Sequence, residues 1–329
     1  EQRVELVDHA RARAVYDWLT PLGEAALDPG AIEVRDWLER LLGACVPRED
    51  GPMAELLVRY KRHRFGRRYA VGGTKTRRST SLQGCPGAVR PLLASHCRDV
   101  DLVNAQGSIL VQKLRQHALM SEASMAPLID YVARRGAWLD EIMEWNLRGL
   151  GDAKARRERA KTLVTAILNG GGVRKWLASE ATSHAHDVPP CVHELARCMR
   201  AVRAAVVGCA AFADVVEWVR GGKGRDHAIE RDALFTDEAA VVRSAFALIY
   251  QRWEDEVLTA LDDSFRAQGW QVMSLVFDGV LLVDRAGVSV EGALRAAEAA
   301  VAEACGLEVA LLEKPLFGLG DAPIAKLAG

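Results

Sequence analysis

The sequence predicts an α+β fold that is mostly helical and contains a small antiparallel sheet. Apolar residues recur at helical spacing through most of the chain, and "WQVMSLVFDGVLLV" over 270–283 is a clear hairpin signal, with Asp-Gly between two apolar runs. Half of the 329 residues are hydrophobic and 26% are charged, which is typical of a soluble globular protein. The longest apolar stretch has ten residues, too few to span a bilayer, so no membrane partner is expected.

Four regions follow in order. Residues 1–60 are predicted to be a helical N-terminal region of two or three amphipathic helices. Residues 61–125 begin with a basic stretch of short strands and loops and continue with "CRDVDLVNAQGSILVQKL", a strand that leads into a helix. Residues 126–235 are predicted to be almost wholly helical, with breaks at "NGGG" and "SHAHDVPP". Residues 236–329 are predicted to hold a long helix, the hairpin, a further helix and a last strand.

The charge distribution is uneven although the net charge is only -1. From Leu56 to Arg98 there are eleven Lys and Arg residues and no Asp or Glu. Such a basic block favours contact with a phosphate backbone, and a plain solvated surface is the alternative.

The cysteine content and the first residues give information on the cellular location of the protein. Seven cysteines, odd in number and without a CxxC pair, indicate reduced thiols and an intracellular location. The chain begins without Met and without a signal peptide, which leaves open that it is part of a longer polypeptide.

Two isolated carboxylates stand in apolar strand segments. Asp278 lies in the hairpin, and Asp101 lies in "VDLVN", with Asp99 two residues earlier on the same face. If these strands pair, the carboxylates converge and repel each other unless a divalent cation lies between them. The alternative is that Asp278 is simply the first residue of an Asp-Gly turn.

A basic face is predicted on the helix "ARRERAKTLVTAILNGGG". Arg157, Lys161, Thr165 and Asn169 recur every four residues, and Gly170 is placed to end the helix. Arg and Lys on one face suit a triphosphate, whereas a solvated basic face is the structural alternative.

In this order the segments resemble the palm and fingers of family A DNA polymerases, the polymerase I-like group, over about residues 65–285. "FGRRY…SLQGCPGAVR" stands where that family has "TGR…NLQNIP…IR". Asp101 and Gln106 have the spacing of motif A, "RERAKTLVTAILNGG" resembles motif B, and "VFDGV" keeps the motif C aspartate. A later family segment matches at Arg243 and Gln251. "DVDLVN" and "FDG" also resemble compact polymerase-like modules of large DNA viruses and some protists.

The departures from the family pattern concern sugar selection, base stacking and fidelity. Phe277 and Gly279 replace the His and Glu that flank the motif C aspartate, and Gln106 replaces a Glu. Thr165 and Asn169 stand where the family offers aromatic rings, and Ala247 replaces an Asn.

The resemblance implies a palm with a small sheet at 61–125 and 236–329, helical fingers at 126–235 and a thumb-like region at 1–60. It implies two Mg²⁺ or Mn²⁺ ions as cofactors and primer–template DNA and dNTPs as partners. The implied metal ligands are Asp101, Asp278 and the carbonyl of Leu102, with Asp99 as the rival of Asp101. The other implied site residues are Arg157 and Lys161 for the phosphates, Gln106, Asn104, Thr165 and Asn169 for the nucleotide, Arg67, Arg68, Gln83 and Arg90 for the nucleic-acid backbone, and Arg243 and Gln251 for the minor groove.

The implied function is template-directed DNA synthesis without proofreading, in replication or repair, and an RNA template is left open. One alternative is a non-catalytic nucleic-acid-binding descendant of a polymerase. Another is a primase or a template-independent terminal transferase. A group of His184, His186, Cys191, His193 and Cys198 has the residue types of a zinc site, but its spacing fits no standard zinc module.

Overall fold

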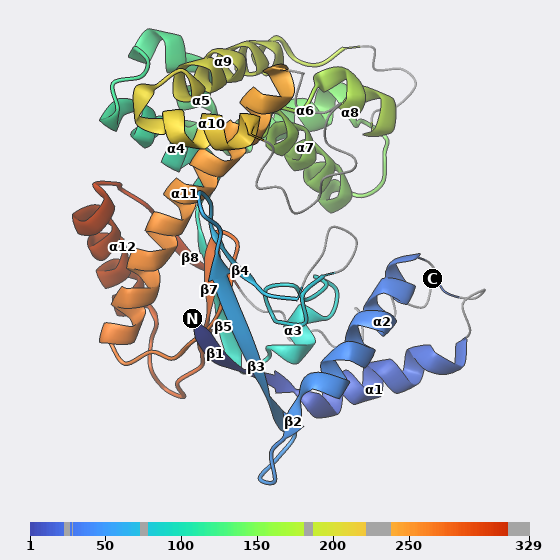
Figure 1. Cartoon of the computed structure of the whole chain (residues 1–329). Helices are drawn as coiled ribbons and strands as arrows, with labels where there is room; N and C mark the ends of the chain where they lie inside the picture. Colours follow the sequence, from blue (N-terminus) through green and yellow to red (C-terminus); the bar gives the residue numbers. More distant parts are fainter. Residues whose placement is uncertain (23–26, 28, 73–77, 181–186, 222–237, 315–329) are drawn as a thin grey trace. The chain divides into compact units, whose positions relative to one another are not determined.

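The chain forms two compact units, one of which is built from both ends of the sequence. The computed structural model describes residues 1–22, 27, 29–72, 78–180, 187–221 and 238–314. Unit 1 comprises Glu1–Val103 and Asp255–Gly329, and unit 2 comprises Asn104–Glu254. Helices predominate, and the strands pair antiparallel in two small sheets (Figure 1). The predicted α+β fold, mostly helical with a small antiparallel sheet, is therefore confirmed.

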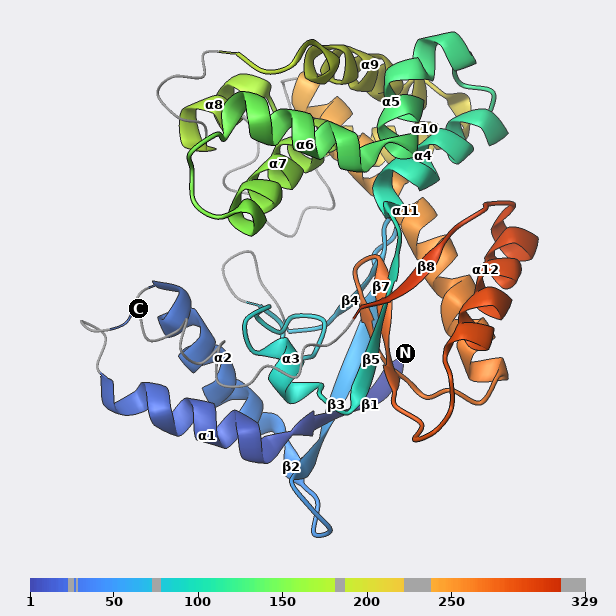
Figure 2. The ribbon, with the colours of Figure 1, turned by 180° about the vertical axis from the view of Figure 1, so that it is seen from behind.

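One sheet of unit 1 contains the predicted hairpin and the predicted strand beside it. Its order is β6-β7-β5-β8, with every pair antiparallel. All residues of β6 are buried, as expected for a strand covered on both faces. Figures 1 and 2 show α12 and the last part of α11 on one side of the strands, and α1 to α3 on the other. The bounds are β5 (Cys97–Leu102), β6 (Val272–Val276), β7 (Gly279–Val283), β8 (Leu311–Lys314), α11 (Glu238–Ala267) and α12 (Glu291–Cys305).

The hairpin turn lies one residue earlier than predicted. Val276 pairs with Gly279, so the two loop residues are Phe277 and Asp278 rather than Asp-Gly. Phe277 adopts φ 52°, a left-handed conformation that is unfavourable for a bulky side chain. Gly279 already belongs to β7, where a Cβ would overlap the Asp101 side chain and the Val100 carbonyl. The glycine is therefore required by the close approach of β5, and not by the turn.

The second sheet of unit 1 was not predicted. Residues 1–60 were expected to be helical, and this is correct for α1 and α2 but wrong at both ends of the segment. The central strand β3 pairs with β1 along one edge and with β2 and β4 along the other. The bounds are β1 (Gln2–Asp8), α1 (His9–Leu19), a 3-10 turn (Thr20–Leu22), α2 (Pro29–Ala44), β2 (Val46–Pro47), β3 (Met53–Arg62), β4 (Arg68–Ala70) and α3 (Arg90–Leu93).

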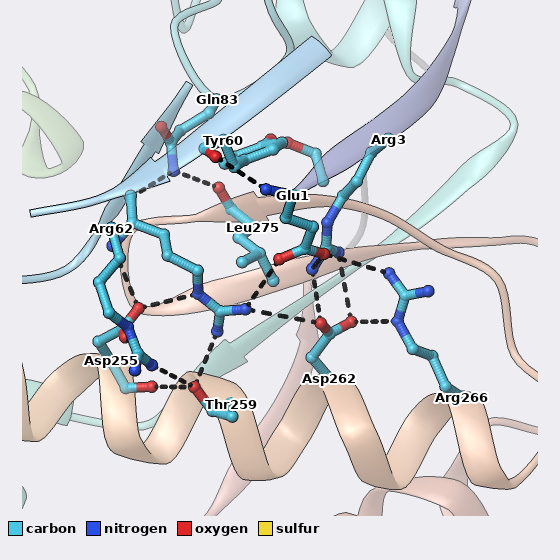
Figure 3. A network of polar contacts seen from close by, with 12 residues as sticks. Glu1, Arg3, Tyr60, Arg62, Gln83, Asp255, Thr259, Asp262, Arg266 and Leu275 are labelled. Carbon is cyan, nitrogen blue, oxygen red and sulfur yellow. Dashed lines mark hydrogen bonds and ion pairs between the residues drawn. The ribbon is translucent and has the colours of Figure 1, made fainter. Parts of the chain in front are cut away.

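Buried ion pairs join this second sheet to the last part of α11. The Asp262 carboxylate accepts hydrogen bonds from both terminal guanidinium nitrogens of Arg3, at 2.5 and 3.2 Å (Figure 3). It also accepts one from the Arg266 Nε at 2.8 Å. Two turns earlier on α11, Asp255 accepts a hydrogen bond from the Nε of Arg68 at 3.0 Å and pairs with Arg62 at 2.5 Å. Asp255 and Asp262 are almost fully buried, so these contacts replace their lost hydration and fix the helix against the sheet.

Unit 2 is helical, as predicted for most of its length. The predicted break at "NGGG" is present: α7 ends at Leu168, and Gly170 follows with φ 89°. Gly107 lets α4 approach α5 closely, because a Cβ there would lie 2.8 Å from Val132 Cγ2. No helix in the described part of the chain has the length and hydropathy needed to cross a membrane. The bounds are α4 (Ala105–Gln116), α5 (Glu122–Ala133), α6 (Arg135–Asn146), α7 (Ala153–Leu168), α8 (Val173–Glu180), α9 (Pro190–Val207), a 3-10 turn (Ala210–Phe212) and α10 (Ala213–Arg220).

Candidate active site

In unit 1, Asp101 lies beside the tip of the hairpin that carries Asp278. The register of β5 and β7 sets Asp101 opposite Gly279, the residue that follows Asp278. The Leu102 amide donates a hydrogen bond of 3.1 Å to the carbonyl of Asp278 and so fixes the tip to β5. The Asp101 side chain is 14% exposed, and Asp278 is half-buried. Two aspartates that are far apart in the sequence thus belong to one end of the same sheet.

Lys314 is a residue of this region that sequence reasoning missed. It ends β8, which pairs with the other edge of β5, and its Nζ forms an ion pair with Asp101 Oδ2. Half of the lysine side chain is exposed. The sequence signal was a charged pair, Glu313 and Lys314, at the end of the predicted last strand. The pairing of β8 with β5 sets Lys314 opposite Asp99, and its side chain reaches Asp101. The Asp101 carboxylate therefore already attracts a cation within the chain.

Asp99 has a different environment from Asp101. It lies opposite Leu281 and Lys314, two residues farther from the hairpin tip. Burial raises the pKa of the Asp99 carboxyl, and the charges of Lys314 and Arg90 act against this shift. Asp99 thus lies farther from the hairpin tip than Asp101 and shares the influence of Lys314.

The carboxylate oxygens of this region are the type of ligand that a divalent cation such as Mg²⁺ prefers, but the region has few of them. No group of three or more His, Cys, Asp or Glu side chains that could hold a metal ion occurs among the described residues. Mg²⁺ is commonly held by one or two carboxylates together with substrate phosphates, and Asp101 and Asp278 supply that number. The contact between Lys314 and Asp101 is an independent sign that this carboxylate binds positive charge.

The described histidine and cysteine side chains of the possible zinc group do not come together at one site. His184 and His186 lie outside the described residues. His193 pairs with Asp187 at 2.5 Å, and Cys191 donates to Glu141 at 3.7 Å. Cys198 is buried and donates to the Ser124 carbonyl at 3.5 Å. The described members thus have separate partners.

A cation and two aromatic rings lie next to the hairpin tip. The Arg67 guanidinium carbon is 4.8 Å from the ring centroid of Phe277 and 5.5 Å from that of Tyr69. Phe277 is 41% exposed and Tyr69 is 37% exposed. Aromatic rings beside an arginine form the type of surface on which nucleic-acid bases and phosphates bind.

Three other predicted backbone contacts have partners inside unit 1. Arg68 binds Asp255, as described above, and Arg90 donates to the Cys85 carbonyl at 3.0 Å. The buried Gln83 side-chain amide donates to the Leu275 carbonyl of β6 at 2.8 Å (Figure 3). It also accepts from the Ala70 amide of β4 at 2.8 Å. Gln83 therefore anchors the strand that leads into the hairpin.

In unit 2, two predicted nucleotide contacts touch each other. Gln106 at the start of α4 donates a hydrogen bond of 2.9 Å to Asn169 Oδ1 at the end of α7. The Asn169 side chain also donates to the Thr165 carbonyl at 2.9 Å. Asn104 caps α4 with φ 51°, and its Nδ2 is buried without a hydrogen-bond partner among the described residues. Gln106, Asn169 and Thr165 are thus linked within unit 2.

The two predicted phosphate contacts on α7 are at the surface and paired with acids. Arg157 donates to Asp140 at 2.9 Å, and Lys161 donates to Glu158 at 2.5 Å. Surface pairs of this kind contribute little, typically about 0–1 kcal/mol, so a phosphate can displace them.

On α11, the two predicted minor-groove residues differ in exposure. Arg243 is exposed and lies beside Gly170, while Gln251 is half-buried.

Comparisons with known proteins give little further guidance. No family model matches the chain, and no curated protein matches it. Among solved structures, the chain is similar to the POL domain of Pol1 from M. smegmatis in complex with DNA primer-template and dNTP. The TM-score is 0.49 and the identity 14%, with 91% of this chain and 55% of that chain covered. The chain thus spans about half of that structure's length, and a likeness at this level assigns neither a family nor a function.

Proposed function

We propose that the chain is a nucleic-acid polymerase that transfers nucleotides from dNTPs to a primer 3′-hydroxyl under the direction of a template. One observation carries this proposal. The strand with the motif A-like aspartate, Asp101, pairs with the hairpin whose tip holds the motif C-like aspartate, Asp278. Convergent carboxylates on a rigid sheet are what phosphoryl transfer requires from a protein.

Asp101, Asp278 and the Leu102 carbonyl are the proposed ligands of the divalent ions. Mg²⁺ or Mn²⁺ bound there would activate the primer hydroxyl and offset the charge of the triphosphate. Asp101 is preferred to Asp99 because it lies beside the hairpin tip, opposite Gly279. Lys314 would leave Asp101 at little cost, since its side chain is half exposed.

The remaining roles are assigned from the resemblance and from exposure. Arg157 and Lys161 would exchange their surface acids for the triphosphate, and Lys161 would also donate a proton to the leaving pyrophosphate. Thr165, Asn169, Gln106 and Asn104 would lie near the nucleotide, with Gln106 next to the sugar. Arg243 and Gln251 would contact the minor groove.

For the nucleic-acid backbone, Arg67 is the proposed direct contact of the basic block. Arg68, Gln83 and Arg90 are assigned a supporting role, because each of them binds groups of the protein itself. The proposal also divides the chain into a thumb-like region (1–60), two palm segments (61–125 and 236–329) and fingers (126–235).

The decisive experiment is primer extension with Mg²⁺ or Mn²⁺ and all four dNTPs. Asp278→Asn and Asp101→Asn should each abolish extension while the circular dichroism spectrum and melting temperature stay near wild type. Asp284→Asn is the matched control, because Asp284 lies just beyond the far end of the same hairpin and pairs with Arg98. Primer extension by Asp278→Asn at a near wild-type rate would contradict the assignment of Asp278 as a metal ligand.

A second candidate is a nucleic-acid-binding protein without catalysis. It is favoured by Phe277 and Gly279 at the motif C positions and by the lysine on Asp101. It predicts salt-sensitive DNA binding with no incorporation under any metal. Reactions with single NTPs or dNTPs, with DNA, RNA or no template, also separate primase and terminal-transferase activity from templated synthesis.

A further inference from the structure

Unit 2 contains a cavity of about 820 Å³ lined by four arginines. Its wall is formed by the end of α7, the glycine segment after it, the start of α8 and one face of α9. The arginines come from two of these helices, and three of them are exposed while the fourth is buried. They are Arg174 from α8 and Arg197, Arg200 and Arg203 from α9.

The positive charge of the cavity is not balanced by the described residues that line it. Asp187, the one carboxylate among them, pairs with His193 at 2.5 Å. Arg174, Arg197 and Arg200 form no ion pair with a carboxylate of the described residues. Exposed arginines elsewhere in the described part of unit 2 do pair with acids, as Arg115 does with Glu122 and Arg134 with Asp130. Unpaired guanidinium groups around a cavity attract an anion.

Arg203 makes the cavity a fixed site rather than a loose set of surface cations. It is 8% exposed, and its NH1 group donates to the Ile167 carbonyl at 3.2 Å. Burial and the charges of Arg200 and Arg243 lower the pKa of its guanidinium. A buried cation with cationic neighbours is unfavourable, and an anion in the cavity would relieve it.

The glycine segment allows these cations to approach the end of α7. A Cβ on Gly170 would lie 3.4 Å from Arg243 Cγ and 3.5 Å from the Arg203 guanidinium. A Cβ on Gly171 would lie 2.9 Å from the Ala166 carbonyl. The absence of side chains at both positions therefore keeps the wall of the cavity close to Arg203 and leaves room for a ligand.

We propose that this cavity binds a ligand with two or more linked phosphate groups, either a free polyphosphate or nucleotide or the backbone of a nucleic-acid strand. Guanidinium groups bind phosphate oxygens in pairs, and several of them in one concave site select linked phosphates over a single carboxylate. The volume is within the range of small-ligand pockets. The site consists of residues other than those assigned to nucleotide transfer, and the proposal is independent of polymerase activity.

Binding of tripolyphosphate and of a short fluorescent single-stranded oligonucleotide tests the proposal on the full chain. The test variant is Arg197→Ala/Arg200→Ala, since both side chains are exposed and tolerate truncation. The charge-matched control is Arg148→Ala/Lys154→Ala, two exposed cations of unit 2 outside the cavity. Calorimetry should show that tripolyphosphate binds the wild type and the control alike, and the test variant roughly tenfold more weakly.

The oligonucleotide identifies the source of the phosphates. If a strand occupies the cavity, the test variant lowers the slope of log affinity against log salt by about two, while the control keeps it. If only tripolyphosphate binding is lost, the cavity is a site for free polyphosphate or nucleotide. The proposal is overturned if neither probe binds the wild type at millimolar concentration, or if the test variant and the control behave the same.

Discussion

At the scale of single residues, Lys314 gives the candidate active site an internal cation. Its ammonium occupies one oxygen of Asp101 and also acts on Asp99. A divalent ion at Asp101 must therefore compete with this contact. Because the lysine side chain is half exposed, breaking its contact with Asp101 costs little free energy. Each ion that binds Asp101 nevertheless has to displace the ammonium group.

Removal of this ammonium should tighten metal binding. Lys314→Met leaves Asp101 without its partner and increases the negative charge that a cation meets. The dissociation constant for Mn²⁺, measured by electron paramagnetic resonance on protein without nucleotide, should fall about three- to tenfold, equivalent to about 1 kcal/mol. Lys314→Arg keeps the positive charge and should resemble wild type. Unchanged or weaker Mn²⁺ binding by Lys314→Met would mean that Asp101 is not a metal ligand.

At the scale of elements, the sequence predicts those whose pattern is local. The hairpin, the strand before α4 and the long α11 follow from alternation or helical spacing of apolar residues. β1 does not, because its buried face carries Arg3 and Glu5 while Val4 on the opposite face is 44% exposed. Both residues find their partners in distant parts of the chain: Arg3 pairs with Asp262, and Glu5 accepts hydrogen bonds from Tyr60 and Leu82. No local pattern contains that information.

The basic block at 56–98 shows that local sequence also predicts the candidate site only in part. The stretch has no acid of its own, which favoured contact with a nucleic-acid backbone. Several of its arginines nevertheless bind acids from other elements, as Arg68 does with Asp255, Arg78 with Glu33 and Arg98 with Asp284. Local charge therefore predicted the presence of cations, and tertiary structure decides which of them are available.

The neighbouring residues Arg67 and Arg68 provide a direct test of this division. Arg68→Ala should lower the free energy of unfolding by about 3 kcal/mol, since it leaves the buried Asp255 with one fewer partner. Arg67→Ala should leave stability within about 0.5 kcal/mol and weaken binding of primer–template DNA, with a shallower salt dependence. Urea unfolding and fluorescence anisotropy measure the two effects. Equal loss of stability in both variants would contradict the assignment.

At the scale of the whole molecule, one buried carboxyl group links several parts of unit 1. Glu5 of β1 accepts hydrogen bonds from the Tyr60 hydroxyl of β3 at 2.8 Å and from the Leu82 amide at 2.6 Å. Tyr60 in turn contacts Ser274 of β6 at 3.0 Å. Burial raises the pKa of Glu5 to about 7, and this outweighs the hydrogen bonds, which act in the opposite direction.

This pKa predicts a stability that decreases as the pH rises. Between about 4.5, the ordinary value of a glutamate, and about 7, the folded chain holds a proton on Glu5 that the unfolded chain has lost. The contribution of Glu5 to the free energy of unfolding should therefore decline across this window, by on the order of 1 kcal/mol per pH unit, and level off above it.

Urea unfolding at several pH values measures this dependence. Glu5→Gln should remove the decline and be the more stable protein above neutral pH, while Glu55→Gln, at an exposed position of β3, should follow wild type. A difference between wild type and Glu5→Gln that does not vary with pH would exclude a proton on Glu5.

The close approach of β5 to Gly279 also constrains how this chain can change over evolutionary time. A family A-like motif C would have a glutamate at this position, but any side chain there would overlap Asp101 and the Val100 carbonyl. A single substitution of Gly279 would thus displace Asp101 unless β5 shifts first. Changes to the hairpin tip therefore have to proceed through neighbours such as Phe277 and Lys314, which leave the contact between β5 and β7 intact.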